Sequence, residues 1–262
     1  MKKSRRLSLV LTFVMILFLC SSVSVNAEES QMVSDDFMRE YLVTLGCPEE
    51  YVDTLSDEKV SNMYNILICG NYEFSGLKQE VVELQDGNAN ARGNIPTSKL
   101  RLTIATFDNV NSLNNVQEVY VSLGYYWLQE PIVTATDALT FNWDGTLFSL
   151  NGFYAMNTSA QNLPVDSIDT PAKSASGGIG WYSRMKDPYL GMVGINGGAE
   201  LLLIPKQTIK ANSNLNSDMH LNYAHATVGL SLSFGISSSG PSAGVSVVSG
   251  VYDEQATYYI YH

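Results

Sequence analysis

The feature that most constrains the fold is a two-residue alternation of apolar with polar or small side chains, which begins near residue 98. Leu100, Leu102 and Ile104 open it, and the same period recurs over residues 119–127 and 228–236. A period of two puts every second side chain on one side of a β-strand, so each segment predicts a strand with one buried face. Because no long amphipathic helical pattern follows, the sequence predicts an antiparallel β-sandwich, or a barrel-like variant, over residues 98–262.

Turn signals and tryptophans refine this prediction. The dipeptide DG at 144–145 predicts a hairpin turn, and NG at 196–197 predicts a second turn before a leucine-rich strand. Trp127 and Trp143 share their strand faces with apolar residues, so we expect both indoles in the core.

Residues 28–70 have a helical period instead and predict a small module of three helices. Ser34 and Ser56 are suitable N-caps, each followed by acidic residues that the helix dipole favours in a first turn. Pro48 suits the first turn of a short helix between them. The expected apolar stripes are Phe37, Tyr41 and Leu45 in the first helix and Val60, Met63, Tyr64 and Leu67 in the third.

Two cysteines, Cys47 and Cys69, lie in this module. If the second and third helices are antiparallel, the two residues meet at adjacent helix ends, which predicts a disulfide in an oxidising environment. The alternative is two reduced thiols in a small helical core. Residues 71–97 are expected to be a linker, because 84–98 is polar and contains glycine without an apolar period.

The N-terminus has the pattern of an export signal. Lys2, Lys3 and two arginines precede an apolar run over residues 7–19, which is too short to span a bilayer. Small residues then allow cleavage after Ala27, so the sequence predicts a signal peptide over 1–27 and a secreted, extracellular protein. Lipidation at Cys20 is the alternative, and it is disfavoured by the bulky leucine before it.

Charge excludes some partners. The leader holds four of the 15 basic residues and none of the 26 acidic ones, so the mature chain has 11 basic against 26 acidic residues and a net charge of −15. Such a chain repels nucleic acid and anionic lipid headgroups, so no nucleic-acid partner is expected.

The sequence GPSAG at 240–244 matches the G-x-S-x-G pattern of serine hydrolases around Ser242, with Asp253 and His262 in a suitable order. A nucleophile elbow needs a helix directly after the serine, whereas residues 245–248 are strand-like. The pattern therefore indicates a turn, and no catalytic residues are predicted.

Metal and cofactor sites are not predicted either. His220 and His225 are five positions apart, so on a regular strand they point to opposite sides and serve as structural residues. The alternating Asn and Asp residues of 212–218 lack the glycine and glutamate of a calcium loop and indicate a polar turn.

Exposed aromatic residues could bind a sugar ring. Tyr126 lies on the strand face opposite Trp127, and Trp181 and Tyr182 lie in a glycine-rich segment. These residues, Tyr126, Trp181 and Tyr182, are the predicted platform for a carbohydrate ligand.

Residues 226–252 contain no charged residue, and apolar residues alternate there with Gly, Ser and Thr. Two arms of this kind around a turn are typical of a membrane-inserting hairpin in a β-pore-forming toxin. The same pattern also predicts a hairpin with one face on a soluble core. A membrane is a partner only in the first interpretation.

The segment YLVTLGCPEEYVDTLSDEKVSNMY at 41–64 resembles helical modules in exported bacterial proteins of unknown role, and the resemblance implies no activity. The sequence as a whole therefore predicts a secreted, non-enzymatic protein with a binding or structural role and an unidentified extracellular or cell-surface ligand. The alternatives are a membrane-inserting protein that uses residues 226–252 and a surface carbohydrate-binding module.

Overall fold

A computed structural model describes residues 33–85, 97–129, 136–159, 163–186, 191, 193–211, 213, 218–225, 233–236 and 244–249. The predicted leader, with Ala27 and Cys20, lies outside the described residues. So do Ser242, Asp253, His262 and most of the polar segment 212–218.

Three helices open the described chain: α2 (Asp35–Thr44), α3 (Glu49–Val52) and α4 (Asp57–Leu67). The predicted caps are confirmed, because the Ser34 and Ser56 hydroxyls accept hydrogen bonds from the backbone of Phe37 and Lys59, each at 3.3 Å. In the described part of the chain, every helix is too short or too polar to span a bilayer.

The apolar stripe predicted for α4 is confirmed, since Val60, Met63, Tyr64 and Leu67 are all buried. The stripe predicted for α2 is wrong in part: the helix buries Met38 and Leu42, while Tyr41 and Leu45 are only half-buried against the same core. Phe37 stays 52% exposed and contacts the Tyr64 ring edge-on.

The predicted disulfide is also wrong: Cys47 and Cys69 are not bonded to each other. The expected antiparallel pairing of α3 and α4 is not the main helix contact, because α4 packs chiefly on α2. Cys47 is consequently buried in the helical core, whereas Cys69 is exposed beyond the end of α4 and its thiol donates to the Asn65 carbonyl.

The rest of the described chain consists of antiparallel sheets, which confirms the predicted fold class. Sheet A has the strand order β1-β2-β3-β9-β5-β6, with β10 beside β3, and sheet B has the order β11-β4-β8-β7. The strands of sheet A are β1 (Tyr72–Gln85), β2 (Thr97–Val110), β3 (Asn115–Gln129), β5 (Phe148–Ser159), β6 (Pro164–Ile168), β9 (Gly194–Pro205) and β10 (Ile209–Lys210). Those of sheet B are β4 (Thr136–Asn142), β7 (Lys173–Ala175), β8 (Gly178–Arg184) and β11 (His220–Ala224).

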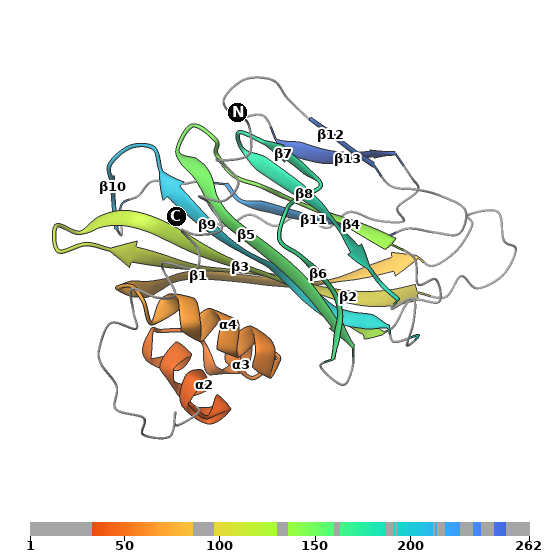
Figure 1. The fold of residues 1–262 in the computed structure, drawn as a ribbon, viewed down its shortest axis with the longest axis horizontal. Coiled ribbons are helices and arrows are strands. Elements are labelled where there is room, and N and C mark those ends of the chain that lie inside the picture. The colour runs from red at the N-terminus through yellow and green to blue at the C-terminus, as the bar shows by residue number, and fades with distance from the viewer. Residues whose placement is uncertain are drawn as a thin grey trace, which may run out of the picture.

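The main core lies between sheets A and B, as the alternating pattern predicts. It contains Leu100, Leu102 and Ile104 of β2 together with the predicted core residues Trp127 and Trp143. A second core lies on the opposite side of sheet A, where the helices pack on Ala105, Phe107 and Tyr120. The layers are therefore helices, sheet A and sheet B, in that order (Figure 1).

The linker predicted for 71–97 is wrong over residues 72–85, which form the 14-residue strand β1. β1 is an edge strand paired only with β2, so much of its surface faces water and its sequence shows no clean alternation. Phe74 and Leu77 of β1 pack on the helical core, so the helices are not separated from the sheets.

Both predicted turns differ from the structure. The turn at 144–145 joins β4 of sheet B to β5 of sheet A, so it crosses between sheets and closes no hairpin. The Asp144 side chain stabilises it by accepting from the backbone of Thr146 at 2.8 Å. Asn196 and Gly197 lie within β9, where they pair with β3 and β5.

Of the uncharged segment 226–252, the structure describes β12 (Ser233–Ile236) and β13 (Val245–Ser249), which pair antiparallel. The pair covers the outer face of sheet B (Figure 1). Phe234 packs on the Tyr182 ring at 4.7 Å between centroids, and Asn142 bonds both the N–H and the carbonyl of Val245. These contacts are those of a hairpin on a soluble core, and membrane insertion stays a prediction.

Candidate functional site

A row of side chains crosses sheet A at the edge of the area that the helices cover. In register, Val81 of β1 lies opposite Arg101, Arg101 opposite Tyr126, Tyr126 opposite Asn196, and Asn196 opposite Thr158. Directly opposite residues in an antiparallel sheet point to the same face, so the five form one cross-strand row. Tyr126 is 38% exposed within it.

Beside the cross-strand row, two glycines leave the sheet without side chains. Gly124 of β3 lies opposite Gly198 of β9. A Cβ atom on Gly124 would lie 3.6 Å from the Lys59 ammonium nitrogen, and one on Gly198 would lie 1.8 Å from the Leu123 carbonyl oxygen. Gly124 therefore leaves a hollow between the cross-strand row and the helices, whereas at Gly198 the neighbouring backbone occupies the place of a Cβ atom.

The segment between α3 and the first turn of α4, residues 53–59, overhangs this hollow. Tyr51, just before this segment, and Lys59, at its end, fix it to the sheet. The Tyr51 hydroxyl lies 3.4 Å from the Ser122 hydroxyl, and the Lys59 ammonium group donates to the Leu123 carbonyl at 2.5 Å.

Lys59 and Glu200 bring opposite charges together under α4. Burial lowers the pKa of Lys59 to about 8, an effect that Glu200 opposes. Burial raises the pKa of Glu200 to about 7, although Lys59 and the Tyr120 hydroxyl lower it in part. Each group favours the charged form of the other, but burial outweighs this attraction and disfavours both charges.

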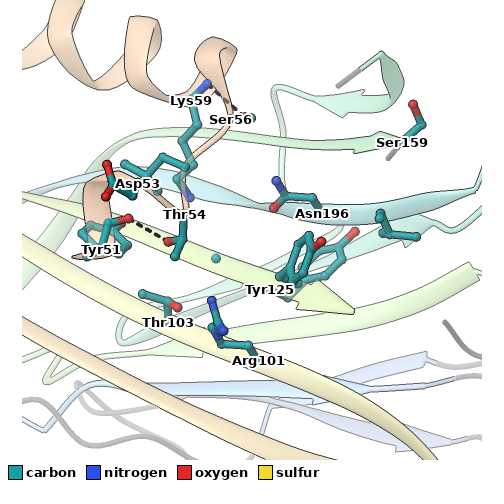
Figure 2. A pocket seen from close by; sticks show the side chains of 14 residues that line it. Tyr51, Asp53, Thr54, Ser56, Lys59, Arg101, Thr103, Tyr125, Ser159 and Asn196 are labelled. Atoms are coloured by element: carbon teal, nitrogen blue, oxygen red, sulfur yellow. Dashed lines mark hydrogen bonds between the residues drawn. The ribbon is translucent and has the colours of Figure 1, made fainter. Parts of the chain in front are cut away.

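Together these elements enclose a cavity of about 410 Å³. Its lining comes from the α3–α4 segment and from β2, β3, β5 and β9, and comprises Tyr51, Asp53, Thr54, Leu55, Ser56, Lys59, Arg101, Thr103, Gly124, Tyr125, Tyr126, Ser159, Ile195 and Asn196. Figure 2 shows Arg101 and Thr103 on one wall, Asn196 on a second, and Asp53 and Lys59 on the overhanging segment. A smaller hollow beside it also touches Ser56, Lys59 and Asn196 and continues to Glu200.

The two freely available charges of this cavity are Arg101 and Asp53, because the Lys59 ammonium group donates to the Leu123 carbonyl and the nearby charge of Glu200 compensates it. Within the described part of the chain, neither Arg101 nor Asp53 makes an ion pair. With the hydroxyls of Thr103 and Ser159, the cavity offers charged and neutral hydrogen-bonding groups around the exposed ring of Tyr126. A concave site with one exposed aromatic ring and several convergent polar groups is suited to a polar small molecule.

The predicted aromatic platform is not brought together. Tyr126 lies on sheet A, whereas Trp181 and Tyr182 lie on β8 of sheet B. Trp181 is 1% exposed, because the alternation of β8 points it with Ile179 into the main core, so its prediction as a ligand platform is wrong. Tyr182 points outward and is packed by Phe234.

The two histidines lie at different places. His220 is on β11 and is partly buried, which lowers its pKa. His225 follows β11 and is fully buried, with Nδ1 at 3.0 Å from both Asp137 oxygens. Tyr223 donates to the same carboxylate at 2.5 Å, so this cluster joins β4 to β11 inside the core. Among the described residues, no three His, Cys, Asp or Glu side chains gather as metal ligands.

Most of the cavity was not predictable. Arg101 and Thr103 are the outward members of an alternating strand, a position that carries no signal of binding. The sequence predicts a turn at Asn196, and Lys59 and Asp53 belong to no motif in it. Their common signal is the register of sheet A, which brings distant strands together.

No family model matches the chain, and no curated protein matches it. Three solved structures resemble it at 10% sequence identity. The first is the KRT10-binding region domain of the pneumococcal serine-rich repeat protein PsrP, with a TM-score of 0.29 over 59% of this chain and 89% of that one. The second is the sixth cohesin of Acetivibrio cellulolyticus scaffoldin B in complex with a dockerin, with a TM-score of 0.24 over 58% and 84%.

The third is a structure concerned with pH-induced modulation of Streptococcus parasanguinis adhesion by Fap1 fimbriae, with a TM-score of 0.26 over 70% of this chain and 94% of that one. Likeness at this level carries no argument about the role of this chain.

Proposed function

We propose that the chain is an extracellular, non-enzymatic binding protein that takes a carbohydrate into the cavity between residues 53–59 and the cross-strand row. The observation that carries this proposal is the exposed ring of Tyr126, placed between Arg101 and Asn196 in the wall of a cavity of about 410 Å³. The export signal predicted over residues 1–27 supports the location outside the cell.

The chemistry of the lining supports a sugar. A pyranose has an apolar face of C–H groups, which an aromatic ring covers well, and a rim of hydroxyls that both donate and accept hydrogen bonds. Tyr126 supplies the ring, while Asn196, Thr103 and Ser159 can donate and accept. Asp53 supplies an acceptor and Arg101 supplies donors.

A glycan array probed with the mature chain, residues 28–262, tests the proposal. The sugars that bind are then titrated by calorimetry against wild type, Tyr126→Ala and Tyr126→Phe. We expect Tyr126→Ala to weaken binding at least about tenfold, the scale for an aromatic residue at the centre of a site, and Tyr126→Phe to keep most of it.

Leu128→Ala is the matched control, because Leu128 is an exposed apolar residue on the same strand outside the cavity lining. An array without any bound sugar, or equal affinity of Tyr126→Ala and wild type, would contradict the proposal.

A further inference from the structure

The charge of the cavity wall points to a narrower ligand class, and this inference rests on the proposed function. We infer that the cavity selects a sugar carrying a carboxylate, such as a uronic or sialic acid, with Arg101 as the partner of that carboxylate. Tyr126 then covers the apolar face of the ring, and Asn196 and Asp53 bind its hydroxyls.

Arg101 is placed for this task by its two neighbours in the cross-strand row. Val81 lies on one side and Tyr126 on the other, so apolar and aromatic groups flank the arginine stem while its guanidinium group lines the cavity. Its side chain is partly buried, and no described carboxylate pairs with it, although the chain holds 26 acidic residues. A guanidinium in a shaped wall, without a protein counter-ion among the described residues, is suited to a bidentate carboxylate from a ligand.

Lys59 does not compete for the same anion. Its ammonium group is committed to the Leu123 carbonyl at 2.5 Å, and Glu200 compensates its charge from the neighbouring hollow. Arg101 is therefore the uncompensated cation of the cavity. Asp53 lies on the overhanging segment and repels a second carboxylate, so one acidic group per sugar, bound at the Arg101 end, fits the charges.

The strand arrangement favours a sugar over an extended peptide. Peptides that bind sheets add to a free strand edge through backbone hydrogen bonds. The strands that carry Arg101, Tyr126 and Asn196 are each paired on both sides, so the site offers side chains and no strand edge.

The test compares each acid with its own methyl ester, which keeps the ring and hydroxyls and removes the charge. The probes are glucuronic acid, galacturonic acid and N-acetylneuraminic acid, each titrated beside its methyl ester by calorimetry. We expect at least one acid to bind wild type about tenfold more tightly than its ester, the scale of a charge-assisted hydrogen bond. In Arg101→Gln the ratio falls to about one, because the acid loses its charge-assisted partner while the ester loses only neutral hydrogen bonds.

Lys78→Gln is the control, because it removes one exposed positive charge from the neighbouring strand outside the cavity and should keep the tenfold ratio. Circular dichroism verifies that both variants are folded. Equal affinity for acid and ester overturns the inference but leaves the proposed function intact, whereas binding of neither these probes nor any array sugar removes the proposed function. A triglutamate peptide that binds as tightly as the best acid overturns the choice of a sugar.

Discussion

At the scale of single residues, two groups of opposite charge, Lys59 and Glu200, are buried where the helices contact the sheet. Both are partly withdrawn from water, which moves the pKa of Glu200 up to about 7 and that of Lys59 down to about 8. Each shift means that the charged form is less favourable in the folded protein than in the unfolded one. Raising the pH therefore lowers stability on the acid side of neutrality, where Glu200 titrates, and raises it on the alkaline side, where Lys59 titrates.

The first prediction follows from these signs. Folded Glu200 holds its proton more tightly than unfolded Glu200, so its contribution to stability is lost as pH rises from about 4.5 to about 7. Lys59 loses its proton more easily when folded, so stability is regained from about pH 8 to about 10.5. Urea unfolding of wild type across this range, compared with Glu200→Gln, should show that the variant lacks the acid-side fall, which is of order 3 kcal/mol. A fall of the same size in Glu200→Gln would refute it.

A second residue-scale prediction concerns Asp137, which is fully buried and receives hydrogen bonds from Tyr223 and faces His225. Asp137→Ala leaves these buried polar groups without their acceptor, so we expect the free energy of unfolding to fall by about 3 to 5 kcal/mol. Asp169→Ala, at an exposed position after β6, should change it by less than about 0.5 kcal/mol. A small loss in Asp137→Ala, measured by urea unfolding, would mean that water replaces the carboxylate without cost.

At the scale of elements, prediction succeeded where a strand has one dry face and one wet face. The alternation over 100–104 and 119–127 identified β2 and β3. The even positions of β2 and the odd positions of β3 are buried between the sheets. It failed for β1, an edge strand whose polar residues gave no period. The site was also missed. Outward-facing residues such as Arg101 form a site only when the register of the sheet places them beside residues of three other strands.

The third prediction concerns the β12–β13 pair on sheet B. The ring of Phe234 in β12 packs on the ring of Tyr182 in β8. It also lies close over Gly180, where a Cβ atom would be 2.7 Å from the Phe234 ring. Phe234→Ala should release the pair, so we expect faster proteolytic cleavage within residues 226–252 and a loss of about 1 to 2 kcal/mol in stability. Leu113→Ala, at a residue 69% exposed, is the control and should change neither. An unchanged cleavage rate in Phe234→Ala would show that other contacts hold the pair.

At the scale of the whole molecule, the helices and the sheets form one body. Ala105, Phe107 and Tyr120 of sheet A complete the core of the helical module, and the backbone N–H of Phe74 in β1 donates to the Leu45 carbonyl at 3.0 Å. The two parts therefore cannot lose their structure independently without exposing this shared core to water.

The fourth prediction is a single cooperative unfolding transition. Trp127, Trp143 and Trp181 all report on the sandwich, whereas Cys47 reports on the helices, where burial raises the pKa of its thiol to about 12 and suppresses its reactivity. In a Cys69→Ser background, tryptophan fluorescence and thiol labelling of Cys47 should therefore give the same urea midpoint. Labelling of Cys47 at a clearly lower urea concentration would show that the helices detach first.

Gly198, in the smaller hollow beside the cavity, has a consequence for how such a chain can change over evolutionary time. A side chain at position 198 would collide with the Leu123 backbone, so mutation there cannot fill that smaller hollow without disrupting the sheet. The side chains of the cross-strand row are held by no such constraint, since Arg101, Tyr126 and Asn196 project from the sheet into the cavity. Descendants of this sequence can therefore exchange one ligand for another while inheriting the same hollow.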